Sequence, residues 1–367
     1  MRKSTVLLVG GAVVVLAFAA TLRFVIVPGL QQLPDDLDTT LHYTGKADIL
    51  DQAALLKGDM ANGFKTGVPV TLEQRVRVVS SHGETVVVTD ETQLTGPDNA
   101  KLSTTKHTFA VDRRSLAAVP APAGVTVEPH EGLTVGFPIP PEPNDYTYWD
   151  YPTATGATAA YVRTEQHAGR ETYVYEMKAA GPLRDPTVVG DLPTALPKSV
   201  LLAFAPTLPP DQQAQLKQYE SLLPDQLPLS YSAEGENTFW VDIATGYVVD
   251  VARKQKVDVS MAVGPIVVPL ASVFSLDLRF APDTVQTITD DASEAASGLT
   301  LISLVIPLLL VGLAIVLVLL PVFLARRRRR RAPRPQETVT EPTAAPTAAA
   351  PSSEKAPPTA VGAADEG

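Results

Sequence analysis

The sequence contains no cysteine. This absence excludes disulfide bonds, thiolate metal sites and cysteine nucleophiles. Histidine is scarce too, and its five copies show neither the i, i+2 or i, i+4 spacing nor the nearby acidic residues that are typical of zinc sites. The nucleophile-elbow pattern G-x-S-x-G and the phosphate loop G-x-x-x-x-G-K-[ST] are also missing. We therefore expect no metal, no cofactor and no enzymatic activity.

Basic residues are sparse in the middle of the chain. The two ends, residues 1–27 and 299–367, hold eleven of the 30 basic residues but only five of the 40 acidic ones. Residues 28–298 are left with 19 basic and 35 acidic side chains, a formal charge of -16. Binding to nucleic acid requires a basic surface, so we expect no nucleic-acid partner. The acidic balance mainly favours solubility.

Two long stretches have almost no charge. Residues 6–27 contain only Arg23, and residues 299–324 contain no charged residue. Each is long enough for a helix to cross a bilayer core of ~30 Å. Basic residues flank both stretches: Arg2 and Lys3 precede the first, and Arg326, Arg327, Arg328, Arg329, Arg330 and Arg331 follow the second.

This charge distribution predicts the orientation in the membrane, because Lys and Arg accumulate on the cytoplasmic side. We predict a cytoplasmic stub and transmembrane anchor over residues 1–27, an extracytoplasmic domain over 28–298, and a second transmembrane helix over 299–325. Both termini then lie in the cytoplasm, and the protein crosses the cell (inner) membrane twice. Residues 326–367 form a basic segment and then a tail of Pro, Ala, Thr and Glu, a composition typical of disorder.

The N-terminal stretch has a second interpretation. Ala17-Phe18-Ala19 matches the small-x-small pattern of a signal-peptide cleavage site. Against cleavage, the apolar character resumes after Arg23, which makes the stretch long enough to span the bilayer. We favour an uncleaved anchor. Both interpretations place residue 28 outside the cytoplasm.

Residues 28–298 have the patterns of a β-rich domain. Residues 274–280 and 257–261 alternate between apolar and polar side chains, as strands with one buried face do. Glycine-containing turn signals separate such runs. One soluble helix is predicted over residues 212–220, after a Pro-Pro-Asp start, and Pro224 ends it.

Short motifs in this domain recur in the same order. His82-Gly83-Glu84-Thr85 has a counterpart in His167-Ala168-Gly169 followed by Glu171-Thr172, and residues 108–112 are echoed by residues 238–242. Such recurrence predicts two related β halves. Copy one covers about 41–120 and copy two about 146–280, with an insertion at about 183–237 that contains the predicted helix.

One aromatic segment is a candidate site for ligand contact. It follows a proline run and ends at Tyr151, and the candidate contact residues are Tyr146, Tyr148, Trp149 and Asp150. The rings could stack on a sugar or lipid while Asp150 binds hydroxyl groups. The alternative, which we favour, is an aromatic plug over the junction of the two halves, with Asp150 capping a turn.

Four short motifs carry a resemblance to a known family: residues 43–45 (Tyr-Thr-Gly), 137–138 (Phe-Pro), 146–150 and 169–173. Together they resemble the actinobacterial porin PorA family of membrane-anchored proteins, which has the same two-anchor layout. The resemblance implies a pore and brings no catalytic residues to transfer.

Three functions are compatible with these patterns. The first is a non-enzymatic cell-envelope protein that binds or passes a lipid or glycolipid at the outer face of the inner membrane, with membrane lipids as its expected partners. The second is a pore or channel component, as the family resemblance implies. The third, a hydrolase with an unrecognised site, is the least favoured because the known motifs are missing.

Overall fold

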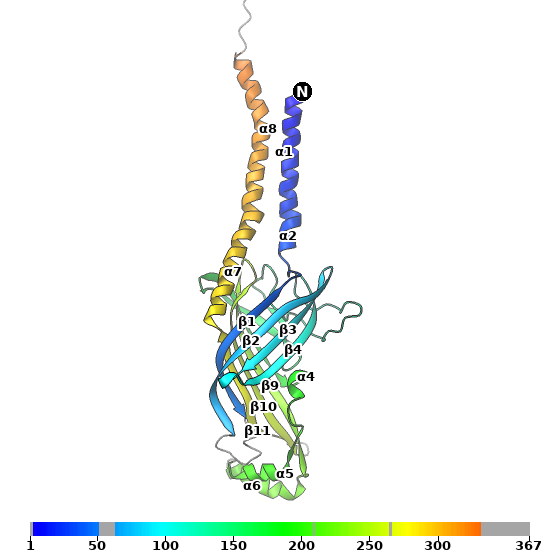
Figure 1. Cartoon of the computed structure of the whole chain (residues 1–367), viewed down its shortest axis with the longest axis vertical. Helices are drawn as coiled ribbons and strands as arrows, with labels where there is room; N and C mark the ends of the chain where they lie inside the picture. The colour runs from blue at the N-terminus through cyan, green and yellow to red at the C-terminus, as the bar shows by residue number, and fades with distance from the viewer. Residues whose placement is uncertain (1–2, 51–62, 208–209, 264–265, 332–367) are drawn as a thin grey trace, which may run out of the picture.

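The fold is described from a computed structural model of the chain, which covers residues 3–50, 63–207, 210–263 and 266–331 (Figure 1). Arg2 and the tail over residues 332–367 lie outside the described residues, so the disorder predicted for the tail stays a prediction.

A single antiparallel sheet of eleven strands forms most of the structure, which confirms the predicted β-rich fold (Figure 1). Ten strands follow one another in the order β4-β3-β2-β1-β11-β10-β9-β7-β6-β5, and the short β8 pairs with β9. The strands are β1 (Asp38–Leu50), β2 (Phe64–His82), β3 (Thr85–Thr95), β4 (Lys101–Asp112), β5 (Tyr146–Asp150), β6 (Thr155–His167), β7 (Arg170–Pro182), β8 (Ala195–Pro197), β9 (Gln226–Asp242), β10 (Val248–Val263) and β11 (Ile266–Phe280).

The sheet curves into a half-barrel, and one face of nearly every strand contributes to a common core. In β2, Val70, Leu72, Gln74 and Val76 are buried, and the residues that alternate with them are exposed. This alternation is the pattern that the sequence predicts for a half-buried strand. The strands predicted at residues 257–261 and 274–280 are parts of β10 and β11.

Aromatic rings fill one end of the half-barrel. Phe137 comes from the segment between β4 and β5 and is almost completely buried. Its ring stacks on Tyr175 at 4.6 Å between centroids, and lies 5.5 Å from Phe239 and 5.6 Å from Tyr148. These rings bring β5, β7 and β9 together around one loop residue, so this end of the barrel is packed solid.

The recurring motifs are paired in the same way in the sheet. Thr85 at the start of β3 pairs with Asp112 at the end of β4, and Thr172 at the start of β7 pairs with Asp242 at the end of β9. These Thr and Asp residues occupy matching positions in the recurring motifs. The motifs therefore correspond in space as well as in sequence, and the duplication into two halves stays a prediction.

The turns after β4 and β9 are also alike. Asp112 Oδ1 accepts hydrogen bonds from Ser115 N at 2.8 Å and Ser115 Oγ at 2.8 Å. Asp242 Oδ1 accepts from Thr245 N at 2.9 Å and Thr245 Oγ1 at 2.8 Å. An Asp side chain that caps its own turn in this way stabilises a tight reversal of the chain.

Helical segments join β7 to β9 at the end of the sheet opposite the two long helices (Figure 1). The predicted helix at 212–220 corresponds to α6. The predicted insertion at about 183–237 also contains the first part of β9, which begins at Gln226 and pairs with β10. Below, the insertion means its part before β9, residues 183–225. Its helices are α4 (Pro186–Val189), α5 (Lys198–Phe204), the 3-10 turn η3 (Ala205–Thr207), α6 (Pro210–Tyr219) and the 3-10 turn η4 (Glu220–Leu222); a further 3-10 turn, η2 (Pro97–Asn99), follows β3.

Two long helices extend from the other end of the sheet and pack side by side (Figure 1). Residues 10–30 and 282–324 are, by length and composition, long and apolar enough to cross a membrane. The first helix consists of α1 (Lys3–Thr21), the π-helical turn η1 (Leu22–Ile26) and α2 (Val27–Leu30). The second consists of α7 (Pro282–Thr300), the π-helical turn η5 (Leu301–Val305) and α8 (Ile306–Arg331).

The second helix begins at Pro282 and not at the predicted residue 299. The first part, α7, is amphipathic and has an acidic outer face, so an apolar run alone does not reveal it. On the inner face, Ala292 is fully buried and Ile288 partly buried against a cluster that contains Trp240. Through α7 the membrane helix is attached directly to the outside of the sheet.

Candidate functional site: a cavity inside the curved sheet

A cavity of about 1040 Å³ lies inside the half-barrel, between the insertion and the rings packed around Phe137 (Tyr148, Tyr175 and Phe239), which we call the aromatic plug. The apolar end of the cavity lies where the insertion crosses the ends of β1, β2 and β11. Its polar end lies deeper in the sheet, close to the plug. The apolar end is lined by Leu50, Phe64, Leu196, Leu201, Leu229 and Leu270, and the polar end by Gln74, Asp90, Tyr148, Tyr151, Asn237 and Arg253.

A chain of hydrogen bonds organises the polar end. Tyr43 OH donates to Gln74 Oε1 at 2.7 Å, and Gln74 Nε2 donates to both carboxylate oxygens of Asp90 at 2.9 and 2.8 Å. Tyr151 OH donates to Asp90 Oδ2 at 2.8 Å. Asp90 is only 2% exposed, and burial raises its pKa. Burial also raises the pKa of Tyr43 to about 12, so this phenol remains a hydrogen-bond donor.

Two polar side chains at this end lack partners. Arg253 of β10 is half-buried with its guanidinium carbon 5.4 Å from the centre of the Tyr43 ring, and it makes no hydrogen bond or ion pair with any described residue. Asn237 of β9 lies directly opposite in the strand register, and its Oδ1 is buried without a donor. Burial alone would lower the pKa of Arg253, but the nearby Tyr43 and Asp90 raise it, so the guanidinium is charged.

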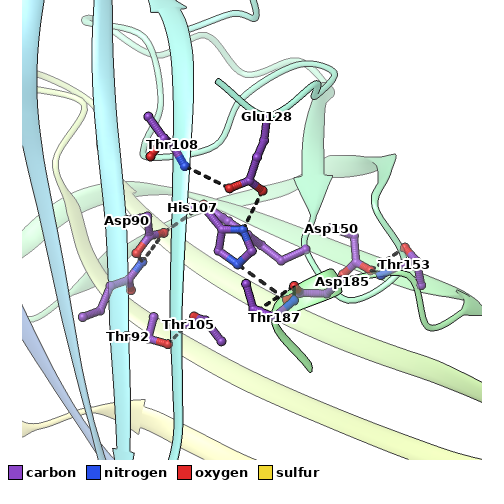
Figure 2. Close-up of polar contacts among 12 residues, drawn as sticks. Asp90, Thr92, Thr105, His107, Thr108, Glu128, Asp150, Thr153, Asp185 and Thr187 are labelled. Atoms are coloured by element: carbon purple, nitrogen blue, oxygen red, sulfur yellow. Dashed lines mark hydrogen bonds and ion pairs between the residues drawn. The ribbon is translucent and has the colours of Figure 1, made fainter. Parts of the chain in front are cut away.

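A histidine of the cavity lining is held between two carboxylates (Figure 2). His107 Nδ1 lies 2.8 Å from Glu128 Oε2, and His107 Nε2 lies 3.5 Å from Asp185 Oδ2. Burial would lower the pKa of His107, but the hydrogen bonds to Asp185 and Glu128 outweigh it and raise the pKa to about 9. We call His107, Glu128 and Asp185 the clasp, because they join β4, the β4–β5 segment and the insertion.

The predicted ligand-contact residues separate in the structure. Tyr148, Trp149 and Asp150 line the cavity. Tyr146 is not part of the lining: its ring packs on Phe137, and its OH accepts a hydrogen bond from Glu142 N at 2.8 Å. Tyr148 is part of the aromatic plug. Asp150 Oδ2 accepts from Thr153 N at 3.1 Å and Thr153 Oγ1 at 2.6 Å, which is a turn cap. Contact with a ligand therefore stays a prediction, and only for the three lining residues.

The predicted topology residues lie at the far ends of the long helices. Lys3 begins α1, and Arg326 and Arg327 are exposed within the arginine run that ends α8. The cavity is remote from them, since it lies inside the sheet.

Sequence reasoning missed Arg253, Asn237 and His107. A signal for Arg253 was present: it shares the strand phase of the buried Val251 and Val257, so it occupies an inward position. A charged residue on an inward face is rare unless it has a role. His107 and Asn237 had no comparable signal, because their surroundings come from distant segments.

The comparison with protein families decides the classification. The model of the family described as Porin PorA matches residues 4–323. The chain belongs to the porin PorA family. The resemblance in the short motifs is thereby confirmed. Family membership and the two long apolar helices together make this chain a β-rich membrane protein of the cell envelope.

Other comparisons add no functional argument. No curated protein matches the chain. Among solved structures, the chain is similar to the full-length peroxisomal multifunctional enzyme type 2 from Drosophila melanogaster, at 12% identity over 65% of this chain and 37% of that chain, with a TM-score of 0.12. It is also similar to a putative MaoC domain protein dehydratase from Chloroflexus aurantiacus J-10-fl, at 10% identity over 73% of this chain and 80% of that chain, with a TM-score of 0.13. TM-scores this low support no inference about activity.

Proposed function

We propose that this PorA-family protein is a non-enzymatic cell-envelope module whose cavity binds a lipid or glycolipid. The observation that carries the proposal is the cavity itself. Its volume of about 1040 Å³ is at the upper end of the range for pockets that hold small molecules, roughly 300–1,000 Å³. A ligand of that size with a long apolar part fits better than a small polar metabolite.

The lining has the division that an amphiphile requires. Leucine and phenylalanine side chains surround the end near the insertion, and a hydrogen-bonding network lies at the other end. Burying an apolar chain in the first part gains about 25 cal/mol per Å² of surface removed from water. The polar groups in the second part then orient the head group.

The membrane anchors keep the domain close to the lipids that we propose as ligands. We propose that residues 28–298 lie on the outer face of the inner membrane with both termini in the cytoplasm, on the basis of the basic residues outside the two spans. A domain attached to two membrane helices stays within reach of the outer leaflet. Loading and unloading of lipid then require no diffusion of a free carrier.

The geometry of His107 argues against catalysis in the cavity. His107 is the one histidine in the described lining, and its two carboxylate partners keep it protonated near neutral pH. A general base must be able to accept a proton at the working pH. A protonated, clasped imidazole is better suited to holding two segments together.

A pore is the second candidate, and the family's name favours it. The two long helices pack directly on one another, and Ala12, Ala19 and Ala314 are among their buried residues. A single pair of helices encloses no channel, so conduction would need several copies. Purified full-length protein in planar bilayers tests this alternative, because a lipid-binding monomer predicts no discrete conductance steps.

The binding proposal is tested with methyl cis-parinarate, a fluorescent acyl ester, added to the full-length protein in detergent. We expect saturable fluorescence enhancement. Replacing Ala271 of the lining by tryptophan fills part of the cavity and should weaken binding, whereas Ala180→Trp on the exposed side of β7 should not. The proposal fails if the wild-type protein gives no saturable signal, or if both variants behave alike.

A further inference from the structure

Arg253 lies inside the cavity with its hydrogen-bonding capacity unused. The guanidinium group has five N–H donors, and none of them reaches an acceptor among the described residues. Its guanidinium carbon lies 5.4 Å from the centre of the Tyr43 ring. Arg253 is half-buried in the cavity lining, where a charge is stabilised by a paired, hydrogen-bonded partner. The unused donors are therefore available to a ligand in the cavity.

The nearest carboxylate does not meet this need. Both oxygens of Asp90 already accept hydrogen bonds from Gln74, and Oδ2 accepts a third from Tyr151. No ion pair joins Asp90 to Arg253 within the described parts of the chain. The charge of Asp90 raises the pKa of Arg253, but Asp90 accepts no hydrogen bond from it.

A second, independent group points to the same place. Asn237 stands opposite Arg253 across the β9–β10 pair, and its Oδ1 is buried without a hydrogen bond. Buried side-chain amides in folded proteins are nearly always satisfied. The NH₂ group of an amide donates hydrogen bonds, so Asn237 can add a donor to a head group held by Arg253.

We propose that Arg253 and Asn237 bind an anionic head group, a carboxylate or a phosphate, on the lipid that occupies the cavity. The inference rests on the proposed lipid-binding function and adds the chemical class of the head group. The planar fork of arginine matches the two oxygens of a carboxylate or phosphate. The acyl chain then lies along the leucine-lined end toward the insertion.

A neutral head group fits these residues less well. Hydroxyl groups would accept some of the hydrogen bonds but would leave the positive charge of Arg253 uncompensated in a partly dry site. An anion supplies both acceptors and charge. Its binding also requires no displacement of the saturated network around Asp90.

The test compares a fatty acid with its neutral ester on the full-length protein in detergent. The probes are cis-parinarate and methyl cis-parinarate, which differ only in the charge of the head group. We expect the wild-type protein to prefer the acid by roughly ten- to a hundredfold, the range for hydrogen bonds to charged groups. Arg253→Gln should remove this preference and leave the affinity for the ester within about twofold.

Control variants separate binding from folding. Lys256→Gln removes a positive charge from the exposed side of the same strand and should keep the preference. Arg253→Lys retains the charge without the fork and should retain part of the preference. Because Arg253 has no hydrogen-bonded partner among the described residues, Arg253→Gln should not lower the melting temperature. Loss of both probes together with a lower melting temperature would show a structural role for Arg253 and overturn the inference.

The remaining outcomes are equally decisive. Equal binding of acid and ester by both wild-type and Arg253→Gln protein would overturn the anionic head group while the lipid-binding function stands. Binding of neither probe would overturn both. Competition of bound cis-parinarate with lysophosphatidate and with inorganic phosphate distinguishes the source of a phosphate. Displacement by the lipid alone supports a lipid head group, whereas displacement by inorganic phosphate alone would mean that the site binds the free ion and would overturn the proposal.

Discussion

His107 Nε2 on β4 lies 3.5 Å from Oδ2 of Asp185, the N-cap residue of α4. One imidazole therefore joins the sheet to the insertion. Asp185 Oδ1 also accepts a hydrogen bond from Thr187 N at 2.9 Å, which fixes the start of α4. The insertion thereby meets the edge of the cavity at a charged contact and not only through apolar packing.

The clasp predicts a stability that falls at alkaline pH. The pKa of His107 rises from 6.5 to about 9 on folding, so its contribution is complete below pH 6.5 and disappears as the pH rises through 9. The charged groups that face His107 are Glu128, Asp185 and, at longer range, Asp90. Because Glu128 is 38% exposed, we expect a contribution on the order of 2 kcal/mol rather than the full value of the shift.

The measurement is thermal unfolding of the full-length protein in detergent between pH 6 and pH 10. Wild-type protein should lose stability relative to His107→Gln as the pH rises, until the two curves meet. His82→Gln, at an exposed turn, serves as the control and should follow the wild type. A pH-independent gap between wild type and His107→Gln would contradict the assignment.

The helical part of the insertion should be removable without loss of the sheet. Pro197 of β8 and Gln226 of β9 are directly paired, so a two-residue Asn-Gly turn can replace residues 198–225 and close a hairpin. The deletion exposes the leucines at the apolar end of the cavity. We expect a β-type circular dichroism spectrum with acyl-probe affinity reduced at least several-fold, since the chain end of the ligand loses its cover. A protein that no longer folds would show that α5 and α6 belong to the core of the sheet.

Small residues should determine the packing of the two long helices. Ala12 and Ala19 are buried on α1, and a Cβ atom on Gly11 would lie 4.0 Å from Leu317 Cδ1 of α8. Close helix contact in membranes depends on such small side chains. A disulfide between Gly11→Cys and Leu317→Cys, in a chain without other cysteines, reports this contact.

Oxidation should cross-link this double variant efficiently. Adding Ala19→Leu should lower the yield several-fold because a larger side chain separates the helices, whereas Val14→Leu, which is 69% exposed, should have no effect. An undiminished yield with Ala19→Leu would mean that the helices are held together only through the domain below them.

The arginine run is expected to act through its charge alone. Basic residues beside an anionic leaflet each gain ~1 kcal/mol, and this attraction does not depend on the shape of the side chain. Replacing Arg326–Arg331 by six lysines should therefore preserve the orientation, as measured by a cytoplasm-specific reporter that is active after Gly367 and inactive at Asn99. Six glutamines should produce chains of mixed orientation. A lysine variant that keeps its orientation but loses lipid binding would identify the run as a specific recognition element.

Local patterns in the sequence were sufficient for the anchors and the strands. The charge-free runs, the alternation in residues 274–280 and the turn motifs before Thr85 and Thr172 depend on neighbours along the chain, and these neighbours determine which face of a segment avoids water. The same patterns did not reveal that the second helix begins at Pro282. The acidic outer face of α7 interrupts the apolar pattern, although its inner face packs on the sheet.

Only the tertiary structure decided where the cavity lies and which residues surround it. Arg253 and Asn237 face one another because β9 and β10 pair in one particular register, and His107 meets Glu128 and Asp185 because two other segments converge on β4. The curvature of the sheet leaves space beyond the rings around Phe137, two of which, Tyr148 and Phe239, line the cavity. These relationships join residues far apart in the chain, and periodicity within a single segment carries no information about them.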